Sequence, residues 1–185
     1  MKLVKEIFYK DDLNLGGKTI TRDSVKAVII DNDLILMINS GKYGDYKFPG
    51  GGIERNETHE DALIREVKEE CGSFVSVIEK EIGKVIEYDR PIEEDFDIFK
   101  MTSYFYKCQV IENYCELDLE QYEERLGFKP VWIPIKEAIQ KNKGIILSSS
   151  QEKPRWIDRD TMVLEYIMDL LQKEQQKQCY SCVNS

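Results

Sequence analysis

A run of three consecutive glycines, Gly50 to Gly52, leads into a segment with clear helix boundaries, and this stretch constrains the chain more than any other. Thr58 can accept a hydrogen bond from the amide of Asp61, and the carboxylate of Asp61 can accept one from the amide of Thr58, which makes a capping box. Gly72 supplies the left-handed residue that ends a helix. The stretch between these signals has an ordinary helix length, so we expect a helix over residues 59–71.

The acidic residues of this helix gather on one side. At about 100° per residue, Glu66, Glu69 and Glu70 fall within about 100° of one another. Carboxylates at that spacing repel one another, and Mg²⁺ or Mn²⁺, which prefer hard oxygen ligands, would remove the repulsion. Alone, such a run is typical of a solvated helix face; the adjacent glycines, which let a backbone approach a ligand closely, favour a binding site. The neighbouring arc, which we expect to be buried, consists of Leu63, Ile64, Val67 and Cys71.

Gly51, Glu57 and the run Arg65-Glu66-Val67-Lys68-Glu69-Glu70-Cys71-Gly72 stand at the spacing of a known motif. They resemble the signature box of the Nudix hydrolases, also called MutT-like. The one departure is Ser73, where the family usually has an aliphatic residue; Phe74 follows and can fill that space.

The resemblance implies an α/β fold, an α/β/α sandwich with a mixed β-sheet between helices. It also implies a hydrolase acting on acid anhydrides, which uses Mg²⁺ or Mn²⁺ to cleave a diphosphate linked to another group. The positions that match the family's metal ligands are Glu66, Glu69, Glu70 and the carbonyl of Gly50. Glu66 also matches the general base of some members, whereas other members take the base from a downstream loop.

Further positions are assigned roles around this box. Arg65 and Glu57 are expected to pair and hold the loop against the helix, a supporting part of the catalytic machinery that suits an arginine fork. Lys47 precedes the glycine loop, where it is either a solvated lysine or a cation near substrate phosphate; Gly51 is the other expected substrate contact. Family members often add a metal-site carboxylate before a Trp-containing strand. Glu123 is the first choice here, with Glu124 and Glu120 behind it, although each also fits a solvated acidic loop.

Size and charge bound the possible functions. The 185 residues suit one domain over residues 1–175, followed by a polar tail over 176–185 that we expect to be frayed. The net charge of −9 argues against long nucleic acid as a partner, but not against a small nucleotide-type substrate. No apolar run is long enough to span a membrane and no signal segment is visible, so we expect a cytoplasmic protein.

The remaining pattern predicts a sheet followed by closing helices. Residues 112–125 are acidic and are expected to be irregular. Tyr104 and Tyr106 share one face of their strand and could stack on a base, although packing is commoner; His59 is expected to be exposed. Strands are expected at residues 3–8, 24–30, 34–38, 74–79, 81–88, 99–110 and 128–134, and helices at 135–142 and 159–174.

Two other functions remain open from the sequence. Some Nudix-like domains bind a nucleotide ligand without cutting it, but these commonly lose box glutamates that are intact here. An isomerase of the superfamily needs a cysteine opposite the box, and no motif places one there. Cys179 and Cys182 have a spacing seen in redox and zinc sites, but no second pair accompanies them. Dimers are common in the family, and a homodimer is compatible with the sequence.

Overall fold

The computed structural model describes residues 1–111, 115–148 and 152–183, and of residues 178–183 only the backbone. Its centre is a seven-stranded mixed sheet with the order β1-β5-β6-β2-β3-β4, in which β7 pairs with β3. The strands are β1 (Leu3–Phe8), β2 (Thr19–Asp31), β3 (Leu34–Ser40), β4 (Tyr46–Lys47), β5 (Phe74–Asp89), β6 (Ile98–Ile111) and β7 (Phe128–Pro134). The helices are α1 (His59–Cys71), α2 (Gln121–Leu126), α3 (Ile135–Leu147) and α4 (Ile157–Val183).

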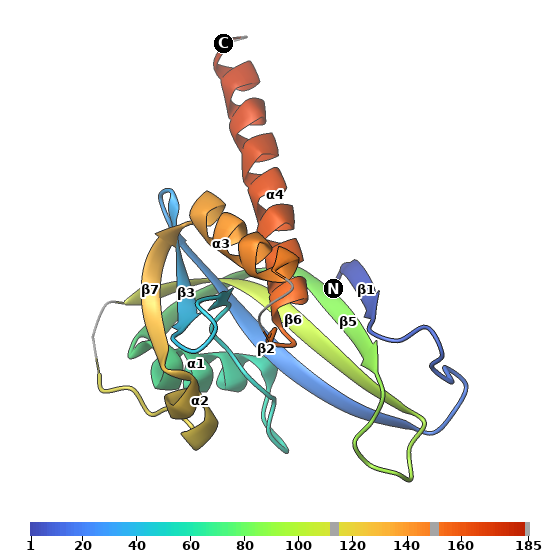
Figure 1. Ribbon diagram of the computed structural model, residues 1–185. Coiled ribbons are helices and arrows are strands. Elements are labelled where there is room, and N and C mark those ends of the chain that lie inside the picture. The colour runs from blue at the N-terminus through green and yellow to red at the C-terminus, as the bar shows by residue number, and fades with distance from the viewer. Residues whose placement is uncertain (112–114, 149–151, 184–185) are drawn as a thin grey trace.

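Helices lie on both faces of the sheet, so the predicted α/β/α sandwich is confirmed (Figure 1). The alternation of side chains along β2 explains how one strand serves both cores. Val28 packs in the core that contains α3 and α4, whereas Ala27 and Ile29 pack in the core that contains α1. A nearly unbroken apolar run in the sequence is therefore the expected pattern for a strand buried on both sides.

Strand β2 has two different neighbours along its length. It runs parallel to β6 from the pair Thr19↔Ile98 to Ile29↔Cys108. It pairs with β3 only at the hairpin, through Ile30↔Ile35 and Asp31↔Leu34. Beyond the hairpin β3 pairs with β4 and β7, and the amides of β2 bond to the glycine loop instead, which brings that loop onto the central strand.

Two expectations about the elements between α1 and β7 need correction. Residues 74–79 and 81–88 belong to one strand, β5, whose pairing with β6 shifts register between Ile78 and Lys80 and again between Glu81 and Gly83; these bulges break the pattern in the sequence. Part of the acidic stretch 112–125 is the short helix α2, and residues 112–114 lie outside the described residues.

Both closing helices are longer than expected. Helix α3 continues through Gly144 to Leu147. Gly144 does not adopt the left-handed conformation with which a glycine ends a helix. Helix α4 begins at Ile157, which is fully buried, and its backbone continues to Val183 through a glutamine- and lysine-rich stretch without glycine or proline. Figure 1 shows this last part extending beyond the sheet. No helix among the described residues is long and apolar enough to cross a membrane.

Candidate active site

The glycine loop is fixed tightly against strand β2. The amides of Val25 and Ala27 donate to the carbonyls of Gly51 and Pro49, at 3.0 and 2.9 Å. Gly50 has a φ of +125°, and a Cβ there would collide with the carbonyl oxygen of Val25. Only glycine adopts that backbone conformation without strain, so the position of the loop backbone is set by the sequence.

Helix α1 presents its carboxylates in two directions. The predicted capping box of Thr58 and Asp61 and the left-handed Gly72 are both present. Glu66 and Glu70 point inward and are 8% and 1% exposed, whereas the side chain of Glu69 stays about a third exposed, at 32%. The expected apolar face is buried except at Ile64, which is 39% exposed because it faces a surface hollow instead of the sheet.

Glu70 links three segments of the site. Its Oε1 lies 2.5 Å from Nζ of Lys47, and its Oε2 accepts a hydrogen bond of 2.7 Å from the amide of Gly50. Lys47 is 5% exposed, so the interpretation of a solvated lysine is wrong. Burial lowers the pKa of Lys47, but the charge and hydrogen bond of Glu70, together with the charges of Glu123 and Asp160, outweigh burial and the pKa is raised.

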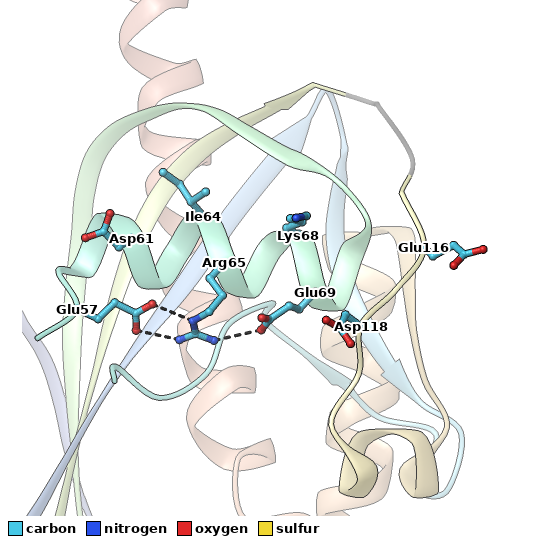
Figure 2. Close-up of a pocket in the computed structure, with 8 residues that line it drawn as sticks. All are labelled: Glu57, Asp61, Ile64, Arg65, Lys68, Glu69, Glu116 and Asp118. Carbon is cyan, nitrogen blue, oxygen red and sulfur yellow. Dashed lines mark hydrogen bonds and ion pairs between the residues drawn. The ribbon is translucent and has the colours of Figure 1, made fainter. Parts of the chain in front are cut away.

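Arg65 holds the loop to the helix as predicted. Figure 2 shows its guanidinium between Glu57 and Glu69, beside a hollow of about 390 Å³. Nε and Nη2 bind the two carboxylate oxygens of Glu57 at 2.8 and 2.9 Å, and Nη2 donates to the carbonyl of Gly52 at 3.0 Å. Nη1 reaches Glu66 at 2.8 Å and Glu69 at 3.1 Å. One side chain thus orients the loop and two box glutamates together.

Glu123 lies on helix α2 and is 5% exposed. It accepts hydrogen bonds from the amide of Glu120 at 3.0 Å and from the hydroxyl of Tyr122 at 2.9 Å. Burial and the negative charge of Glu70 raise the pKa of Glu123 to about 7. The same two causes raise the pKa of Glu66. The charge of Glu70 on α1 therefore acts on Glu66 of the same helix and on Glu123 of α2. Glu120 and Glu123 both line one cleft of the molecule, whereas Glu124 is exposed.

A cleft of about 770 Å³ contains the loop and most of these groups. Two buried cations in it were missed by sequence reasoning. Lys26 donates to the carbonyl of Gly50, and burial together with the charges of Lys47 and Arg159 lowers the pKa of Lys26 to about 7. Arg159 binds Glu87 at 3.0 Å and its neighbour Asp160 at 2.7 Å. A lysine inside the apolar run of β2 was the available signal for Lys26; nothing local marked Arg159.

Aromatic side chains also line the cleft, but not those that the sequence suggested. Tyr104 and Tyr106 pack against His59, whose Nδ1 lies 2.7 Å from the hydroxyl of Tyr106. His59 is therefore half-buried instead of exposed, and neither tyrosine lines the cleft. The aromatic residues that do line it are Tyr9, Tyr43, Phe99, Tyr122, Phe128 and Trp156.

The donor set suits a hard divalent cation. Glu66, Glu123 and the Gly50 backbone line one cleft, and Glu70 is bonded to that backbone. Burial and the charge of Glu70 raise the pKa of Glu66 and of Glu123, and such an ion would relieve the repulsion between these charges. Among the described residues, no three acidic, histidine or cysteine side chains converge closely enough to hold an ion. Glu70 and Glu69 are instead paired with Lys47 and Arg65.

The chain matches curated proteins in sequence over part of its length. An RNA pyrophosphohydrolase of Nitratiruptor sp. is 30% identical over 76 residues, which are 38% of this chain and 49% of that protein. Diphosphoinositol polyphosphate phosphohydrolase 3-alpha of Mus musculus is 31% identical over 111 residues, 58% of this chain and 59% of that one. The chain thus spans about half the length of the curated relatives it matches.

The solved structures show the same fold. A NUDIX hydrolase from Nitrosomonas europaea superposes with a TM-score of 0.56 at 19% identity, covering 81% of this chain and 90% of that one. The NUDIX domain model matches residues 20–151, which include the glycine loop, α1 and α2. This match, together with a sandwich whose helix α1 carries the complete box, shows that the chain belongs to the NUDIX family.

Proposed function

We propose that the protein is a divalent-metal-dependent pyrophosphohydrolase. Its substrate is a small nucleoside-diphosphate-linked compound or a nucleoside triphosphate, and it is cut at a phosphorus–oxygen bond between phosphates. The observation that carries the proposal is the position of Glu66 and Glu70: both are buried and are held at the glycine loop by Arg65 and by the amide of Gly50. The names of two curated relatives, an RNA pyrophosphohydrolase and a diphosphoinositol polyphosphate phosphohydrolase, support a phosphohydrolase.

The metal would be Mg²⁺ or Mn²⁺, held by Glu66, Glu69, Glu70, Glu123 and the carbonyl of Gly50. When bound, such an ion neutralises phosphate charge and polarises the phosphorus–oxygen bond. Lys26 bonds to the carbonyl of Gly50 and Lys47 to Glu70, so each cation shares an oxygen with the proposed ligand set. Both line the cleft, and we assign them to the phosphate oxygens of the substrate, which would pass along Gly51.

The chemical step needs a water and an acceptor for its proton. Water attacks phosphorus, the bond from phosphorus to the bridging oxygen breaks, and that oxygen leaves with the electron pair. Glu66 is the first candidate for the proton acceptor, because its carboxylate lies against Gly51 and its pKa is raised. A base on another loop is the alternative. Arg65 and Glu57 keep the geometry and do not react.

A substrate panel and an isotope-labelling experiment test this proposal. A panel of nucleoside triphosphates, dinucleoside polyphosphates, ADP-ribose, sugar nucleotides and diphosphoinositol polyphosphates is incubated with Mg²⁺ or Mn²⁺. Hydrolysis in ¹⁸O-labelled water then places label on a phosphate product. If these compounds bind and none is cut, the protein is a nucleotide-binding module, the second candidate, which the intact glutamates disfavour.

The three described cysteines are free, as suits a reducing cytoplasm.

A further inference from the structure

Four aromatic side chains form a continuous row along one side of the cleft. Tyr43, Trp156, Phe128 and Tyr122 contact one another in sequence, each pair edge to face. The ring centroids are 6.4, 5.9 and 6.2 Å apart along the row, within the range for favourable aromatic pairs. The four residues come from three separate parts of the chain, so only the fold brings them together.

Trp156 is held in place at the middle of this row. Its Nε1 donates a hydrogen bond of 2.6 Å to Oδ2 of Asp45, and the Asp45 side chain is fully buried. Trp156 itself is only partly buried and lines the cleft. A planar ring that is fixed before a ligand arrives gives contact area at little cost in conformational entropy.

The row passes beside the proposed phosphate-binding part of the cleft. The ammonium of Lys47 lies 4.6 Å from the centre of the Phe128 ring, and the same ammonium pairs with Glu70 of helix α1. A group attached to a diphosphate at Lys47 would therefore have the aromatic row beside it. Tyr104 and Tyr106, which pack on His59, offer no such continuity.

We propose that this aromatic row is the nucleobase subsite of the cleft, with Trp156 as the ring on which the base stacks. The proposal rests on the proposed function, and it assigns the part of the cleft that would hold the aromatic base of such a substrate. Every base has a π-face, so stacking tolerates purines and pyrimidines alike. A polyhydroxylated ring such as inositol has no π-face and gains little from this surface.

The two tryptophans provide a direct test. In the Trp132→Phe variant Trp156 is the only fluorescent tryptophan, and the row itself is unchanged. In the matched Trp156→Phe variant Trp132, on strand β7 outside the cleft, is the only one. The probes are the α,β-methylene diphosphates of adenosine and uridine, whose bridging carbon resists cleavage, and methylenediphosphonate, which lacks the nucleoside.

We expect the nucleotide analogues to quench Trp156 with saturation and to leave Trp132 nearly unchanged. Methylenediphosphonate should quench neither. By calorimetry, Trp156→Leu should bind the nucleotide analogues about tenfold more weakly, the equivalent of about 1.4 kcal/mol, and bind methylenediphosphonate as the wild type does. Because Trp156→Leu loses the bond to Asp45, its melting temperature is measured too; the Trp132→Phe titration stands even if that variant unfolds.

Three results would overturn the subsite. They are quenching of Trp156 by methylenediphosphonate as strong as by the nucleotides, calorimetric binding of nucleotides without quenching, and failure of both nucleotide analogues to bind. The proposed hydrolase is judged separately. Equal KM values of wild type and Trp156→Leu for nucleotides that are cut would remove the subsite and keep the hydrolase. Saturable quenching without turnover of any diphosphate would keep the subsite and remove the hydrolase.

Discussion

The ammonium of Lys47 lies 2.5 Å from Oε1 of Glu70, and both side chains are almost wholly buried. The amide of Gly50 donates to the other oxygen of the same carboxylate. One carboxylate thus ties β4, the glycine loop and α1 together, so its removal affects the fold as well as the chemistry.

Glu70→Gln should lower kcat by about 10²-fold or more, because it removes a proposed metal ligand. It should also lower stability by about 3–5 kcal/mol, since Lys47 loses its buried partner. The double variant Lys47→Met/Glu70→Gln removes the unpaired charge and should regain stability without regaining activity. Steady-state kinetics and urea unfolding separate the two effects; near-wild-type turnover of either variant would contradict the assignment.

Glu69→Gln should also remove most activity, but with little change in melting temperature, because the Glu69 side chain is about a third exposed. Glu60→Gln, an exposed change on the same helix, is the matched control and should keep full activity. Excess EDTA should abolish turnover in the wild type, and Mg²⁺ or Mn²⁺ should restore it. Full activity in EDTA would refute metal dependence.

Lys26→Met should raise KM about tenfold, since a charge-assisted contact to phosphate is lost. Stability should hold or improve, because the change removes from an apolar strand a buried cation whose hydrogen-bond acceptor is the Gly50 carbonyl. Lys26→Arg keeps the charge and should recover part of the lost affinity. An unchanged KM in Lys26→Met would show that the lysine serves only the loop.

The buried carboxyl of Asp45 should make stability depend on pH. Burial raises the pKa of Asp45 from 3.8 to about 6, and its Oδ1 has no hydrogen-bond partner among the described residues. Between these values the folded protein keeps a proton that the unfolded chain has lost, so this stabilisation is present below pH 4 and disappears as the pH rises to 6. The loss is at most about 3 kcal/mol.

Asp45→Asn tests this dependence, because an amide oxygen can still accept from Trp156 and does not titrate. The difference in unfolding free energy between wild type and variant, measured by urea titration at several pH values, should shift in favour of the variant between pH 4 and 6. A difference that is constant over that range would exclude the raised pKa.

Deletion of residues 176–185 should leave activity and stability nearly unchanged. The backbone of α4 continues to Val183, but this part extends past the sheet. Kinetics and thermal melting of the truncated chain provide the test. The side chains of Cys179 and Cys182 lie outside those described, so a zinc assay on the intact chain is added; zinc bound tightly and lost on deletion would assign these cysteines a site.

The sequence predicted best what nearby residues decide. The capping box at Thr58 and the left-handed Gly72 need only their own neighbours, and both are present. Arg65 and Glu57 are eight residues apart, and their pairing was predicted from the resemblance. The metal and catalytic roles of these residues, including Glu123, stay predictions, as do the domain boundary at residue 175 and a homodimer.

The sequence predicted poorly what distant residues decide. The position of Lys26 in the site follows from the hydrogen bonds that join β2 to the glycine loop. Arg159 is placed by its ion pair with Glu87, which is 72 residues away in the sequence. Burial of Lys47 depends on Glu70 in the same way. Such ion pairs depend on the meeting of separate strands and helices, which periodicity does not encode.

Three cations of the cleft are buried, and this affects the rate of substrate association. The molecule carries a net charge of −9, while Lys26, Lys47 and Arg159 are 4%, 5% and 4% exposed. An approaching polyphosphate is therefore repelled at long range by the net charge. It meets attractive charge only close to the cleft, from the exposed Arg22, Lys153 and Arg155 and then from the three buried cations. Salt screens the distant field over about 8–10 Å and leaves buried contacts largely intact. Association should thus quicken as ionic strength rises, the opposite of electrostatically steered binding.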